Sequence, residues 1–208
     1  MDHTDVARQF TRSDGSYLFA RWGRPIAPVV FGVDDATLSI VKGAVEAVVA
    51  LADHRMTDLD PELGANMLIF FITGWDELTA TPDLDRLLPE LPDLVVRLKA
   101  ADANQYRAFR FDPDGAIKAA FVFVRMDAAL ADIPAEDLAL AQAAQTILLW
   151  SDTAFMDCGP LATVDGRVML NPDVAGVIRA AYDPVMPAVA TDPSHALRLA
   201  ARLGAGTN

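Results

Sequence analysis

The sequence predicts an α/β protein of the α+β kind, in which helices pack on a mixed sheet that contains a β-hairpin, followed by a helical C-terminal tail. Apolar runs of strand length alternate along the chain with stretches of helical spacing. Two aromatic and β-branched runs flank Asp112-Pro113-Asp114-Gly115, whose residues favour a tight turn. No internal repeat or linker divides the chain, so residues 1–208 are expected to form a single globular domain.

The first elements are a strand, a helix and a second strand. Residues 25–33 have strand composition, and their prolines favour an edge strand or the start of a strand. Residues 37–54 repeat apolar side chains at spacings of three and four, which predicts a helix with Asp34 or Asp35 as N-cap. Residues 66–73 form a continuous apolar run, as expected of a strand covered on both faces.

The middle of the chain contains the hairpin and two further helical regions. Residues 81–100 resume helical spacing but include Pro89 and Pro92, which predicts a kink or two short helices. Residues 105–125 are expected to form the β-hairpin. Residues 134–150 follow with a helix that begins at a proline.

The tail is expected to be helical. An irregular stretch is predicted at residues 157–167, and two helices are predicted at 173–182 and 193–203.

Composition narrows the range of partners. The chain has 17 basic and 29 acidic residues and a net charge of −12, so its average field repels polyanions and no nucleic-acid partner is expected. Cys158 is the only cysteine, which excludes an internal disulfide and a multi-cysteine zinc site.

The apolar runs are short. The densest runs are far below the roughly 20 residues that a membrane-spanning helix needs, so no membrane span is expected. Residues 1–10 hold no apolar leader. The sequence as given therefore predicts a cytoplasmic protein, or a periplasmic one if a leader has been removed.

Motifs for metal, phosphate and hydride chemistry are absent from the sequence. His3, His54 and His195 lie too far apart for the His-Glu-x-x-His spacing that places two imidazoles on one zinc ion. The glycine-rich nucleotide loops and the nucleophile elbow are also missing. We therefore expect neither a metal nor a cofactor.

Several residues are candidates for other chemistry. Cys158 could act as a nucleophile, although an inert thiol is the simpler interpretation. Asp112-x-Asp114-Gly115 resembles part of a calcium loop, but Arg110 occupies the first ligand position, so a hairpin turn is favoured. Trp22, Trp75 and Trp150 could line a cleft, although core packing is the default. Acidic groups that could supply acid/base catalysis, or serve only as solvated caps, are Asp34 with Asp35, Asp58 with Asp60 and Glu62, and Asp83 with Asp85.

Three stretches resemble an uncharacterised bacterial family, usually exported or lipid-anchored, with a helix like that of zincin metallopeptidases. They are Arg21-Trp22 followed by Pro25, residues 145–152 from Gln145 to the Ser151-Asp152 pair, and residues 178–184, which resemble a Leu-Tyr-Asp-Pro helix end. The resemblance implies a zincin-like fold and a degenerate site at Gln142, Gln145, Ser151 and Asp152.

One departure from this family decides what the resemblance can imply. Where the family shows a His-Glu-Glu start to the helix, this chain has Leu140-Ala141-Gln142. The side chains of Leu and Ala can neither ligate zinc nor relay a proton, so peptidase chemistry does not carry over.

Three hypotheses follow. The first is a catalytically inactive zincin-like scaffold that binds a protein or small-molecule ligand. The alternative is a metal-independent hydrolase or transferase that uses acidic residues or Cys158. A third is a structural role, in which the helical tail docks on a partner or forms a homo-oligomer.

Overall fold

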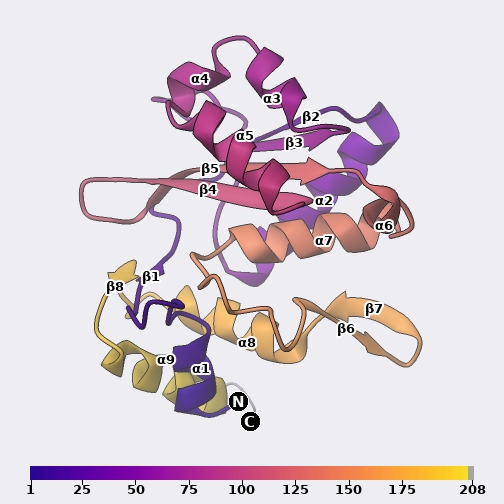
Figure 1. Ribbon diagram of the computed structural model, residues 1–208. Helices are drawn as coiled ribbons and strands as arrows, with labels where there is room; N and C mark the ends of the chain where they lie inside the picture. The colour runs from indigo at the N-terminus through magenta and orange to yellow at the C-terminus, as the bar shows by residue number, and fades with distance from the viewer. Residues whose placement is uncertain (206–208) are drawn as a thin grey trace.

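The computed structural model describes residues 1–205 and has the expected α+β architecture (Figure 1). The helices are α1 His3–Arg8, α2 Asp35–Leu51, α3 Asp76–Ala80, α4 Leu84–Leu87, α5 Leu91–Ala100, α6 Ala128–Ala131, α7 Ala135–Thr146, α8 Pro172–Ala181 and α9 Ser194–Ala205. The strands are β1 Phe19–Ala20, β2 Pro28–Phe31, β3 Met67–Ile72, β4 Gln105–Phe111, β5 Ile117–Arg125, β6 Leu161–Val164, β7 Arg167–Leu170 and β8 Val189–Ala190.

The main sheet is mixed, with the strand order β2-β3-β5-β4. Strands β2, β3 and β5 run parallel, and β4 pairs antiparallel with β5 as the predicted hairpin. The N–H of Gly115 donates to the carbonyl of Asp112 at 2.8 Å, and Gly115 has φ +88°, so Asp112-Gly115 forms a turn as predicted. Both outer strands, β2 and β4, leave one edge without a strand partner in this sheet.

Helices cover both faces of the sheet. Helices α2 and α7 pack in the larger core cluster, and α3, α4 and α5 pack in the other; in Figure 1, α5 crosses in front of the sheet and α3 and α4 lie above it. The layer of α3, α4 and α5 packs against Phe70, Phe121 and Phe123. Below α7 lie α8, α9 and α1, with β1 and β8 paired antiparallel beside them.

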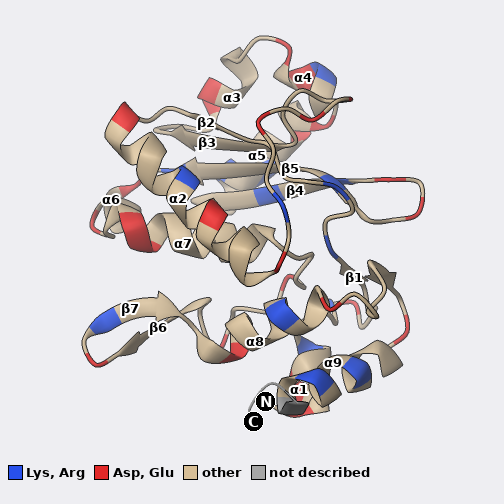
Figure 2. Cartoon of the chain, turned by 180° about the vertical axis from the view of Figure 1, so that it is seen from behind, with Lys and Arg blue, Asp and Glu red and all other residues tan. Residues whose placement is uncertain are grey.

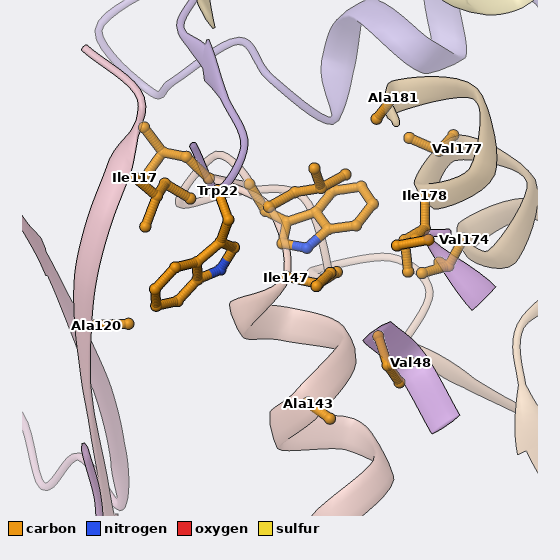
Figure 3. Close-up of a cluster of buried hydrophobic side chains, with 14 of the residues drawn as sticks. Trp22, Val48, Ile117, Ala120, Ala143, Ile147, Val174, Val177, Ile178 and Ala181 are labelled. Carbon is orange, nitrogen blue, oxygen red and sulfur yellow. The ribbon is translucent and has the colours of Figure 1, made fainter. Parts of the chain in front are cut away.

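Trp22 lies at the centre of the larger core cluster. Its side chain is fully buried, between the strand that carries Ile117 and Ala120 and the end of α7, where Ala143 lies in the helix and Ile147 follows it (Figure 3). Its indole N–H donates to the carbonyl of Thr146 at 3.0 Å. The residue therefore ties the sheet to the end of α7, which is a core role.

Several predicted elements agree closely with the structure. The apolar run at 66–73 is the inner strand β3, and the helix predicted at 37–54 is α2, whose N-cap Asp34 accepts from the backbone N–H of Thr37. The 81–100 region contains two helices, and Pro92 lies in the first turn of α5, where the missing N–H does no harm.

The helix predicted at 134–150 is too long. Helix α7 ends at Thr146, because the next residues pair with the chain before β2. Leu148 forms an antiparallel bridge with Arg21, and the N–H of Leu149 donates to the carbonyl of Ala20 at 2.9 Å. Tertiary pairing here overrides the helical spacing.

The irregular stretch predicted at 157–167 is wrong in its second half. Strands β6 and β7 form a hairpin around Asp165 and Gly166, both of which have positive φ. An Asp-Gly pair favours this kind of turn, so the sequence does contain a local signal for this hairpin. Helices α1, α3 and α6 were also not predicted.

The predicted tail helices correspond to α8 and α9. Ala196 and Leu199 of α9 are buried in the larger core cluster, and α9 packs beside α1 and α8. Among residues 1–205, no helix combines the length and the apolar character that a membrane crossing requires.

Candidate binding groove along strand β4

The outer edge of β4 lines a groove of about 840 Å³. One wall is β4 itself, from Gln105 to Phe111. The opposite wall comes from residues 12–14 and from residues 149–152, together with Phe155 and Met156. The groove therefore lies between the sheet and the segment that follows α7.

The backbone of β4 presents unpaired hydrogen-bonding groups to this groove. In an antiparallel pair, alternate residues bond to the partner strand and the others point away. The N–H of Arg125 donates to the carbonyl of Asn104, whereas the N–H of Ala120 donates to Asn66, on the β3 side. With the observed register, Tyr106, Ala108 and Arg110 bond to β5.

The remaining residues, Gln105, Arg107 and Phe109, then direct their backbone groups to the free edge. A free edge of this kind is a template for a further strand.

Aromatic side chains form the far wall of the groove. Trp150 stacks on Phe10 with ring centroids 5.4 Å apart, and Phe155 meets Trp150 edge-on at 5.2 Å. The indole N–H of Trp150 donates to the carbonyl of Ala144 at 2.9 Å, which fixes the ring against the end of α7. All three tryptophans are buried in the core clusters, and Trp150 is the one of the three whose ring also borders this groove.

Two residues of the predicted degenerate site face β4 from α7. Gln142 is buried, and its amide nitrogen donates to Oε1 of Gln105 at 2.6 Å. Gln145, one turn later, lines the groove and accepts a hydrogen bond from Nη2 of Arg107. The side chains of Gln105 and Arg107 therefore lie on the α7 face of the sheet.

The other two predicted site residues line the same groove, but their side chains form hydrogen bonds with the segments of the opposite wall. Ser151 bonds to the carbonyl of Arg8 and to Thr153. Asp152 accepts from the backbone N–H of Ser13 at 3.0 Å and from its hydroxyl, which lowers the pKa of the carboxyl. The structure thus brings Gln145, Ser151 and Asp152 to one groove, with Gln142 behind it.

Arg107 was not singled out from the sequence. Burial lowers its pKa to about 10, and its Nε is shielded from solvent without a hydrogen-bond partner among the described residues. The hairpin prediction placed it on a strand. To predict that its side chain faces α7, one must know the strand register and the strand order, and the sequence specifies neither.

The histidines have separate partners. His54 lies with Nε2 2.8 Å from the carbonyl of Arg24, and burial lowers its pKa. His195 contacts Tyr17, and His3 lies in α1. In the described part of the chain, no three His, Cys, Asp or Glu side chains come close enough to share a metal ion.

The residues on α7 do not fit the zinc that the zincin resemblance would imply. Leu140 and Ala141 offer no ligand atoms, and the amide nitrogen of Gln142 is held by Gln105. We therefore derive no chemical step through a metal.

The remaining catalytic candidates lie outside the groove. Cys158 is exposed and lies near Arg8 and Asn171 in a separate depression. Asp60 and Glu62 bind Arg24. Burial opposes ionisation of Asp60, but hydrogen bonds from the backbone of Leu63 and Glu62 outweigh it and lower its pKa, and a hydrogen bond from Lys118 lowers the pKa of Glu62. These acids are ion-paired. A lowered pKa does not suit a general base or acid at neutral pH.

No family model, curated protein or solved structure matches this chain.

Proposed function

We propose that this protein is a non-catalytic, zincin-like binding module whose ligand is an extended segment of polypeptide lying along β4. The observation that carries the proposal is the free edge of β4 inside the groove, with the backbone groups of Gln105, Arg107 and Phe109 directed outward. Strand addition to such an edge uses main-chain hydrogen bonds for affinity and side-chain pockets for selectivity.

The composition of the groove supports a peptide rather than a small polar molecule. Phe155 on the far wall and Phe109 and Phe111 on the β4 side offer apolar contact area, while the buried Trp150 supports Phe155 from behind. Phe111 is 43% exposed, so apolar surface is available to a partner. The groove follows β4 from Gln105 to Phe111, which is long enough for several residues of an extended peptide.

The absence of an assembled acid/base pair in the groove supports binding without turnover. Glu90 is paired with Arg110 at 2.7 Å, and Asp152 is held by Ser13. Hydrogen bonds from these partners lower the pKa of both carboxyls, so both are charged at neutral pH. Neither is suited to donate a proton there.

The test is a selection from a randomised library of short peptides, followed by affinity measurements on two matched variants. Phe109→Ala and Phe109→Pro both remove the ring, but only the proline removes the outward N–H, and proline is tolerated on a strand edge. We expect the proline variant to bind a selected peptide about ten-fold more weakly than the alanine variant. Equal affinities of the two variants, or no selected peptide, would refute strand addition at β4.

The same peptide separates the module from the enzyme alternative. Mass spectrometry after prolonged incubation is expected to recover the peptide intact and unmodified. Cleavage or modification that disappears in Cys158→Ser or Asp152→Asn would instead favour the hydrolase or transferase hypothesis.

A further inference from the structure

Arg107 is a cation on the groove wall without an acidic partner. No carboxylate oxygen of the described residues lies within 4.0 Å of its guanidinium, whereas Arg24, Arg110 and Arg125 each have at least one acidic partner. The chain has 29 acidic residues against 17 basic ones, so acidic partners are abundant. An uncompensated arginine at this point therefore needs another explanation.

The surroundings of Arg107 exclude solvent from part of its guanidinium group without supplying protein hydrogen bonds in place of water. Its Nε is shielded and makes no hydrogen bond within the described residues, and burial lowers its pKa to about 10. Within the described residues, the one hydrogen bond of this side chain runs from Nη2 to the neutral amide oxygen of Gln145. An amide orients the guanidinium but leaves its positive charge unneutralised.

Of the other charged groups that line the groove, Arg110, Glu90, Asp14 and Asp152 have partners, and Arg12 lies on the opposite wall without an ion pair in the described residues. Arg110 pairs with Glu90 at 2.7 Å. Asp14 accepts from Ser16, and Asp152 accepts from Ser13. The hydrogen bonds from Ser16 and Ser13 lower the pKa of these two carboxyls, and the charge of Arg12 lowers both further, so this loop balances part of its own charge. Figure 2 shows acidic and basic positions distributed over most elements, with basic positions on β4.

We propose that the ligand of this groove carries a carboxylate, either an acidic side chain or a free C-terminus, which is bound by the guanidinium of Arg107. The planar fork of arginine matches the two oxygens of a carboxylate, and charge-assisted hydrogen bonds of this kind are about twice as strong as neutral ones. Gln145 acts as a positioning residue, because it holds Nη2 on the α7 side. This inference rests on the proposed function for the site and adds the ligand's chemistry.

The experiment uses glutarate as a probe, with neutral glutaramide and inorganic phosphate as comparisons at constant ionic strength. Binding is followed by NMR of the Arg107 side-chain Nε–H and of the β4 backbone amides. We expect a saturable glutarate response at both, and none with glutaramide. Arg107→Gln should weaken glutarate binding by about ten-fold or more, because a hydrogen-bonded charge pair is lost.

Two further variants make the result specific. Arg107→Lys keeps the charge but loses the fork, and is expected to bind glutarate several-fold more weakly than the unaltered chain. Arg125→Gln removes an arginine of β5 that is paired with Asp102, and should bind glutarate normally. An unaltered affinity in both Arg107 variants would overturn the assignment.

The remaining outcomes are also decisive. Tighter binding of phosphate than of glutarate would overturn the choice of a carboxylate. Absence of a saturable glutarate response would overturn the inference as a whole. If selected peptides bind the β4 edge equally well with and without carboxylates, the proposed function stands and the carboxylate inference falls. If glutarate binds at Arg107 but no peptide adds to β4, the carboxylate inference stands and strand addition at β4 falls.

Discussion

Tyr17 and His195 form a buried hydrogen bond that joins the loop before β1 to the start of α9. The phenol oxygen lies 2.8 Å from Nδ1 of the imidazole, and the residues are 178 positions apart. Burial raises the pKa of Tyr17 and lowers that of His195, so both side chains are neutral at pH 7 and either can donate in this hydrogen bond. The other ring nitrogen, Nε2, has no partner within the described residues.

This pair predicts a loss of stability in mild acid. Burial lowers the pKa of His195 from 6.5 to about 4. Between these two pH values, the imidazole is protonated in the unfolded chain but stays neutral in the folded chain. The free energy of unfolding therefore falls as the pH drops from about 6.5 to 4, by about 3 kcal/mol from this residue at roughly 1.4 kcal/mol per pH unit.

Chemical denaturation at several pH values measures the effect. His195→Gln should be less stable at pH 7 but should lose less stability between pH 6.5 and 4 than the unaltered chain. Tyr17→Phe removes the phenol hydroxyl, leaves Nδ1 of His195 without its partner and should destabilise by about 1–2 kcal/mol at pH 7. Parallel pH profiles for the unaltered chain and His195→Gln would contradict the assignment.

Replacement of glycine by alanine should have opposite effects on stability at positions 32 and 43. A Cβ at Gly32 would lie 2.0 Å from the carbonyl oxygen of Phe71, and the residue has φ +80°. Gly32→Ala should therefore destabilise by more than about 2 kcal/mol. Gly43 lies on the exposed side of α2 with nothing within 4 Å, so Gly43→Ala should stabilise by about 0.5–1 kcal/mol. Thermal unfolding of both variants checks the pair.

Leu199 and Leu197 test whether α9 is part of the core. Leu199 is fully buried, whereas Leu197 is 53% exposed on the same helix. We expect Leu199→Ala to cost about 2–5 kcal/mol and Leu197→Ala less than about 1 kcal/mol, as measured by urea denaturation. Near-equal small effects would instead favour a tail that detaches to dock on a partner.

Trp22 should be among the most sensitive core positions. Trp22→Ala is expected to cost about 3–5 kcal/mol, because a fully buried indole leaves a large cavity and the carbonyl of Thr146 loses its donor. Equilibrium denaturation measures this, with Trp75→Phe as a comparison in the other core cluster. A cost below about 1 kcal/mol would show that the sheet and α7 do not depend on this contact.

The sequence predicted those elements whose local signals agree with their surroundings. The continuous apolar run became β3, covered on both faces, and the turn at Asp112-Gly115 closed the hairpin. The end of α7 was missed because Leu149 pairs with Ala20, a contact that lies far away in the sequence. Periodicity carries no information about such a partner.

The candidate site was predicted only in part. The resemblance pointed to Gln145, Ser151 and Asp152, which line one groove. Arg107, which faces Gln145, was not found, because the face that a strand residue occupies depends on the register and on which strand lies at the edge.

Backbone hydrogen exchange at Arg107 and Ala108 tests the central claim most directly. In the free chain, the N–H of Arg107 should exchange fast because it points to the free edge, whereas the N–H of Ala108, bonded to β5, should be protected. A bound peptide should then slow exchange at Arg107. Protection of Arg107 in the free chain, or unchanged exchange there with a peptide bound, would contradict strand addition along β4.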